Sequence, residues 1–95
     1  MTPQEIRQSV REGTFYFDPQ DGIYSDHFPS YPVVPGSLIM QSFVNLVSSG
    51  KIDSFRFLSF IPPGHYTWRI EEQPEKWNCF LFQGDQMVVR GTLGR

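Results

Sequence analysis

Residues 26–45 (DHFPSYPVVPGSLIMQSFVN) constrain the fold of this chain more than any other stretch. The first half of the stretch contains Pro29, Pro32 and Pro35 at three-residue intervals. Each proline fixes its own φ and disfavours helical backbone at the residue before it, so no helix can continue through this segment. We therefore predict a stiff loop, and a stiff loop holds a side chain in a fixed position. The side chain at the start of this loop is that of His27.

The sequence changes character at Gly36, after which apolar residues predominate. These residues occupy nearly the whole circumference of a helix, a pattern that indicates a helix buried on all sides. Gly36 or Ser37 can serve as the N-cap, and Gly50 stands where a C′ glycine would end the helix. The sequence therefore predicts one long buried helix over residues 37–49.

The few polar residues of this helix lie on one narrow stripe. Gln41, Asn45 and either Ser48 or Ser49 are spaced so that they share one helix face. A stripe of amides on a buried helix, next to a rigid loop that carries a histidine, is a candidate functional site. The alternative is that these amides only satisfy neighbouring backbone groups, as most buried polar side chains do.

The rest of the chain is predicted to be mainly strands, because its apolar and polar residues alternate with a period of two. Turn signals separate the alternating segments, and a capping box at residues 2–5 predicts a short helix before them. The expected elements are a helix over residues 3–11 and strands over residues 14–17, 52–60, 65–71, 77–82 and 86–92. One long helix and about five antiparallel strands predict an α+β fold with the sheet wrapped around the helix.

The spacing H-F-P-x-x-P-x-x-P-G from His27 to Gly36, followed by a helix, resembles the motif of the 3-hydroxyacyl-acyl carrier protein dehydratases, which have the hotdog fold. In that family the motif reads His-Phe-Pro-Gly-x-Pro-x-x-Pro-Gly, and a catalytic Glu or Asp follows on the helix. This acid lies fourteen residues after the histidine, a position that Gln41 occupies here. Ser30 replaces the glycine of the motif, and the family's glutamine one turn after the acid corresponds to Asn45.

The resemblance covers roughly residues 14–93 and implies a single hotdog domain over residues 1–95. In the family two hotdog units pair, and the acyl tunnel runs along the interface between their two buried helices. The histidine of each site comes from one protomer and the carboxylate from the other. The resemblance therefore implies that His27 faces Gln41 of a partner chain, in a homodimer or in a heterodimer with a second hotdog subunit.

The resemblance also implies roles for individual residues. His27 would be the catalytic base, since an imidazole with a pKa near ~6.5 suits that role at neutral pH. The Gly36 amide would polarise the thioester carbonyl, and Gln41 would stand at the acid position. A side-chain amide cannot deliver a proton, and losing a general acid typically costs on the order of 10²–10⁴ in rate. A homodimer should therefore be a weak or inactive lyase. The implied substrate-binding residues are Phe28, Pro35, Ser37 and Asn45.

Three functions remain open. The first is a dehydratase subunit of fatty acid or polyketide-type biosynthesis that needs a partner to supply the acid. The second is a thioesterase or double-bond isomerase, in which Asp26 or Tyr24 would assist, and the third is a non-catalytic module that binds acyl chains or a carrier protein. No cofactor is expected beyond the phosphopantetheine of acyl carrier protein or coenzyme A that carries the substrate. The candidate contacts to that arm are Lys51, Arg56, Arg69 and Arg90.

Composition argues against several other classes. A net charge of −2 gives no electrostatic reason to expect nucleic acid or an anionic membrane as partner. The single Cys79 offers neither a disulfide framework nor a zinc pattern, and its alternation with Trp77 and Leu81 predicts a small core residue. His65, at a strand start, is expected to be exposed. Without a long apolar run or a signal-peptide pattern, we expect a cytoplasmic protein, and 95 residues bury so little surface that a dimer is expected.

Overall fold

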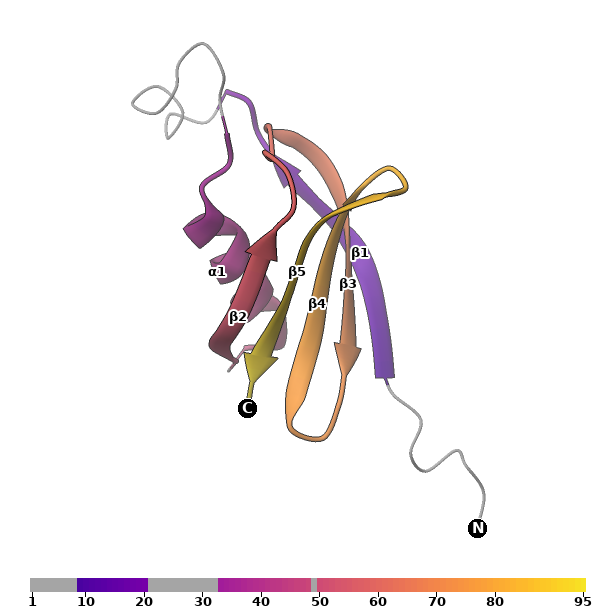
Figure 1. Cartoon of the computed structure of the whole chain (residues 1–95). Helices are drawn as coiled ribbons and strands as arrows, with labels where there is room; N and C mark the ends of the chain where they lie inside the picture. The colour runs from indigo at the N-terminus through magenta and orange to yellow at the C-terminus, as the bar shows by residue number, and fades with distance from the viewer. Residues whose placement is uncertain (1–8, 21–32, 49) are drawn as a thin grey trace.

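The computed structural model describes residues 9–20, 33–48 and 50–95, and in these residues one helix lies against one face of a five-stranded sheet (Figure 1). The elements are β1 (Ser9–Phe17), α1 (Gly36–Val47), β2 (Lys51–Phe57), β3 (Gly64–Glu72), β4 (Lys76–Gln83) and β5 (Gln86–Gly94). All strand pairs are antiparallel, and the strand order is β1-β3-β4-β5-β2. The predicted α+β class is confirmed, and the architecture is compatible with a hotdog fold.

The N-terminal helix prediction is wrong where the structure can test it. Residues 9–11 belong to β1, whereas residues 3–8 lie outside the described part of the chain. β1 pairs with β3 along its whole length, from Ser9 opposite Glu72 to Phe17 opposite Gly64. A complete ladder of strand hydrogen bonds therefore overrides the local helix signal, since propensity is only a weak prior.

The helix after the proline segment is shorter than predicted. It spans Gly36–Val47, which is 12 residues, rather than residues 37–49. Ser48, and not the C′ candidate Gly50, adopts the left-handed conformation that ends the helix, with φ of 73°. The Ser48 amide donates to the carbonyl of Val44 at 2.8 Å, so the last turn is closed by this residue.

The helix is also not buried on all sides. In the single chain, Ile39 and Phe43 are its only fully buried residues, and the polar stripe with Gln41 and Asn45 is exposed. The sheet covers one side of α1, and the described residues place nothing over its opposite side (Figure 1). The apolar circumference of the helix therefore exceeds what one copy of this sheet can bury.

The hydrophobic core fills the space between α1 and the sheet. The prediction that Cys79 is a small core residue is confirmed, since Cys79, Trp77 and Leu81 on β4 are all buried, as are Tyr66 and Ile70 on β3. Phe43 links the helix to both edge strands, with its ring centroid 5.4 Å from Phe15 on β1 and 5.9 Å from Phe55 on β2. The core thus depends on an aromatic contact at the middle of α1.

Two glycines in the sheet make room for aromatic rings on the strand opposite. Gly91 on β5 is the cross-strand partner of Phe55, and Gly13 on β1 is the partner of Trp68. A Cβ built on Gly91 would lie 2.5 Å from the Phe55 ring and 2.7 Å from the carbonyl oxygen of Ser54. The ring therefore occupies the volume that a side chain at position 91 would need.

We predict that Gly91→Ala lowers the free energy of unfolding by about 1–3 kcal/mol, because an added methyl group meets both a ring and a backbone oxygen. Chemical denaturation of the full chain measures this loss. Gly94→Ala is the matched control, since the nearest atom to its added Cβ is 4.0 Å away. If the two variants lose the same stability, the close approach of the Phe55 ring and the Ser54 carbonyl to position 91 does not explain why glycine is found there.

The hairpins follow the sequence prediction, and the edge strand is shorter than predicted. The β3–β4 and β4–β5 turns lie at residues 73–75 and 84–85, and Gly84 has the positive φ of 59° that a tight turn needs. β2 ends at Phe57, so residues 58–60 of the predicted strand continue beyond the sheet. Within the described residues no helix has the length and apolar character needed to cross a membrane.

Candidate functional site

The N-terminus of α1 has two backbone donors that no described residue accepts. Pro35 is the N-cap, without a side-chain cap, and its carbonyl accepts the amides of Leu38 at 3.0 Å and Ile39 at 3.3 Å. The amides of Gly36 and Ser37 have no hydrogen-bond partner among residues 9–20, 33–48 and 50–95. Free N–H groups and the helix dipole together favour a negatively polarised oxygen at this position. The arrangement can therefore polarise a carbonyl group, provided that a substrate reaches it.

The start of α1 is fixed by the segment that follows β2. The buried Val34 donates its amide to the carbonyl of the buried Ile61 at 2.7 Å. Gly36 lies against the ring of Phe57, and a Cβ at this position would be 3.0 Å from the ring. Glycine at position 36 thus lets the helix begin directly on the aromatic ring at the end of β2.

The amide stripe of α1 lies on its exposed side. The Gln41 side chain donates through Nε2 to the Asn45 Oδ1 at 2.9 Å, one helical turn further on. The predicted stripe is therefore real, but its two amides bond to each other rather than to neighbouring backbone. α1 contains no aspartate, glutamate or histidine, so the helix offers no side chain that could exchange a proton at neutral pH.

The structure places some of the predicted site residues and leaves others untested. Pro35, Gly36 and Ser37 meet at the start of α1, and Gln41 and Asn45 follow along its exposed side. The predicted arm contacts Lys51, Arg56, Arg69 and Arg90 lie on strands of the sheet. The roles of all these residues stay predictions, and four further predicted site residues lie outside the described part of the chain. These residues are Tyr24, Asp26, His27 and Phe28.

Cys79 and His65 are two further reactive side chains in the described part of the chain. Burial raises the pKa of the Cys79 thiol to about 12, so this thiol stays protonated at neutral pH and is no nucleophile. His65 is exposed, as predicted, and stacks on Tyr16 with ring centroids 4.4 Å apart. In the described part of the chain, no three His, Cys, Asp or Glu side chains are grouped to hold a metal ion.

An exposed apolar surface covers β2 and the segment after it. β2 is an edge strand of the sheet, with one side unpaired in the single chain. Ile52 and Phe57 on β2, and Leu58 and Phe60 after it, expose 52%, 40%, 48% and 84% of their surface. An unpaired strand with exposed apolar side chains is a surface on which another chain can pair and pack.

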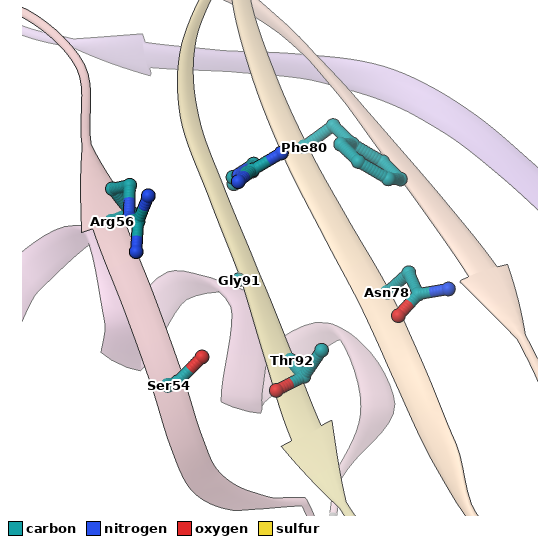
Figure 2. A pocket seen from close by; sticks show the side chains of 7 residues that line it. Ser54, Arg56, Asn78, Phe80, Gly91 and Thr92 are labelled. Carbon is teal, nitrogen blue, oxygen red and sulfur yellow. The ribbon is translucent and has the colours of Figure 1, made fainter.

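A polar pocket lies on the sheet face away from α1, and its lining includes Arg56 and Arg90, two of the four cations predicted as contacts to the phosphopantetheine arm. Arg56 and Arg90 are directly opposite each other on β2 and β5, and Phe80 of β4 is opposite Arg90. Figure 2 shows Arg56 and Phe80 in front of the sheet, with the helix behind it. The pocket has a volume of about 330 Å³ and is lined by Ser54, Arg56, Asn78, Phe80, Arg90, Gly91 and Thr92. Locating it required the strand register, which the sequence did not supply.

Comparison with known proteins identifies the fold. No family model matches the sequence, and no curated protein matches it. Among solved structures, the chain is similar to one from the dehydratase heterocomplex ApeI:P of Xenorhabdus doucetiae, with a TM-score of 0.77. The two share a fold. The likeness covers 93% of this chain and 88% of the other at 18% sequence identity, so it reaches over the whole architecture without showing a common activity.

Proposed function

We propose that the chain is a hotdog subunit of a 3-hydroxyacyl thioester dehydratase and that a second subunit supplies its missing acid. The observation that carries the proposal is the exposed side-chain amide of Gln41, which donates a hydrogen bond to Asn45. In the family that the sequence resembles, a carboxylate occupies the position of Gln41. The likeness to a chain of a dehydratase heterocomplex supports both parts of the proposal, the reaction and the need for a partner.

The proposed reaction removes water from the substrate by general acid–base catalysis. His27 takes the proton from the α-carbon, and the thioester carbonyl is polarised by the free amides of Gly36 and Ser37. The carboxyl group of the second subunit gives its proton to the 3-hydroxyl group. The C–H and C–O bonds break, a carbon–carbon double bond forms, and the hydroxyl group leaves as water. The thioester is carried by acyl carrier protein or coenzyme A.

The surface of the single chain favours a second subunit. α1 buries one side on its own sheet, while the amide stripe and the edge strand β2 stay open. A partner that pairs along β2 covers Ile52 and Phe57 and lies beside the exposed side of α1. Such a dimer provides the apolar burial that a 95-residue chain lacks and brings a side chain toward the stripe.

A mixed dimer built from this chain tests the proposal. Wild-type chain and a His27→Ala/Gln41→Glu variant, each with its own tag, are coexpressed, and the mixed dimer is isolated through both tags. Its one complete site pairs His27 of one chain with the new glutamate of the other. We expect the mixed dimer to dehydrate a 3-hydroxyacyl thioester at least ~10²-fold faster than either homodimer, because each homodimer lacks the acid or the base.

The matched control is a mixed dimer of wild type and His27→Ala, which has no acid in either site. An active Gln41→Glu homodimer together with an inert mixed dimer would show that the base and acid come from one chain, and the two-subunit site would be wrong. If every combination is inert while the chain still binds acyl carrier protein, the dehydratase proposal fails and a binding module takes its place.

A further inference from the structure

Two arginines face each other in the pocket on the outer side of the sheet. Arg56 and Arg90 are cross-strand partners on adjacent strands, and both side chains are exposed at the pocket. Neither has an ion-pair partner among the described residues. Like charges directly opposite each other on paired strands destabilise the folded state, so this arginine pair lowers the stability of the fold.

The acidic side chains nearby do not neutralise the pair. Glu71 forms an ion pair with Arg69 at 2.8 Å, one strand beyond Phe80. The Asp53 carboxylate accepts a hydrogen bond from the Thr92 hydroxyl at 3.0 Å, at the pocket rim. Asp53 forms no ion pair with any described residue. The charge of the two guanidinium groups is thus available to a ligand.

The remaining lining residues suit a small polar ligand. Ser54 and Asn78 supply a hydroxyl and an amide that can donate hydrogen bonds, and both side chains lie on the same sheet face as Arg56 (Figure 2). The ring of Phe80 forms an apolar wall next to Arg90 in the strand register. A volume of about 330 Å³ lies at the lower end of the range for small-molecule sites.

We propose that this pocket binds a phosphate group, either free or as a monoester, between Arg56 and Arg90. Guanidinium groups bind phosphate oxygens through paired N–H donors, and a phosphate monoester carries about −1.5 to −2 charges at pH 7. One such group neutralises both arginines, whereas a single carboxylate leaves one positive charge over. The inference stands apart from the dehydratase proposal, because the pocket and α1 lie on opposite faces of the sheet (Figure 2).

Thermal unfolding of the full chain at constant ionic strength tests the site, with sodium phosphate compared against sodium chloride. We expect phosphate at about tenfold above its Kd to raise the Tm of the wild type by roughly 5–10 °C. Arg56→Gln, Arg90→Gln and the double variant should lose this rise. In sodium chloride the Tm of these variants should be no lower than that of the wild type, because each substitution removes the repulsion between the two guanidinium groups.

Arg69→Gln is the matched control, since Arg69 lies on the same sheet face but is already paired with Glu71. This variant should keep the full rise in Tm. No rise in the wild type, or an equal rise in the double variant, would overturn the proposal.

Calorimetric titration with inorganic phosphate, pantetheine 4′-phosphate and adenosine 3′,5′-bisphosphate distinguishes free phosphate from a phosphate monoester as the ligand. Binding of an ester at least about tenfold tighter than inorganic phosphate identifies a phosphate monoester as the ligand, and equal affinities identify free phosphate.

Discussion

Replacing Gln41 by glutamate is expected to raise the rate at which the purified chain dehydrates a 3-hydroxyacyl thioester by roughly 10²–10⁴-fold. The substitution supplies a general acid at the position where the resembling family carries one, and an amide cannot donate a proton at accessible pH. Gln41 is exposed in the single chain, so a carboxylate there needs no buried counter-charge and the fold should tolerate it. The rate is measured as turnover of the thioester by the homodimer.

Two further variants test whether the gain in rate requires a carboxylate at position 41 and the imidazole of His27. Asn45→Glu places the same carboxylate on the same stripe one helical turn later and should give no gain, because four residues of α-helix move the carboxylate by about 6 Å from the acid position. His27→Ala combined with Gln41→Glu should return the rate to that of the wild type. If instead the wild type turns over well and Gln41→Glu slows it, the amide serves its own chemistry. The thioesterase or isomerase alternatives then replace the dehydratase.

The proline-to-helix transition was the most informative part of the sequence. Pro35 and Gly36 mark where the helix begins, because proline cannot sit in its interior, although Pro35 is the N-cap rather than the predicted Gly36 or Ser37. The position of the stripe with Gln41 and Asn45 followed from helical spacing, and its hydrogen bond confirms that spacing. Local rules were sufficient here because each of these features depends on residues close in sequence.

Features that depend on distant residues were missed. The helix predicted over residues 3–11 conflicts with the pairing of β1 and β3, which no local signal reports. The apolar circumference of α1 predicted complete burial, but a single sheet covers only one side of the helix, so the pattern exceeds what this chain buries by itself. The opposition of Arg56 and Arg90 depends on the β2–β5 register, which a bulge between Ile52 and Ser54 shifts.

Replacing Phe43 by alanine is expected to cost about 3–5 kcal/mol of the free energy of unfolding, the usual loss for a buried aromatic residue. Phe43 has no exposed surface, and its ring contacts Phe15 on one edge strand and Phe55 on the other. Truncation therefore leaves a cavity at the point where α1 meets both sides of the sheet. Chemical denaturation of the full chain, with a fixed protein concentration to hold any dimer constant, measures the loss.

Phe43→Leu and Gln41→Ala separate the causes of this loss. Leucine keeps much of the buried volume and should cost clearly less than alanine, whereas Gln41→Ala, on the exposed side of the same helix, should change stability by less than about 0.5 kcal/mol. A Phe43→Ala loss below about 1 kcal/mol would mean that α1 is not held on the sheet through this ring. Most of the helix's burial would then come from a partner subunit, and the stability of the chain should depend strongly on protein concentration.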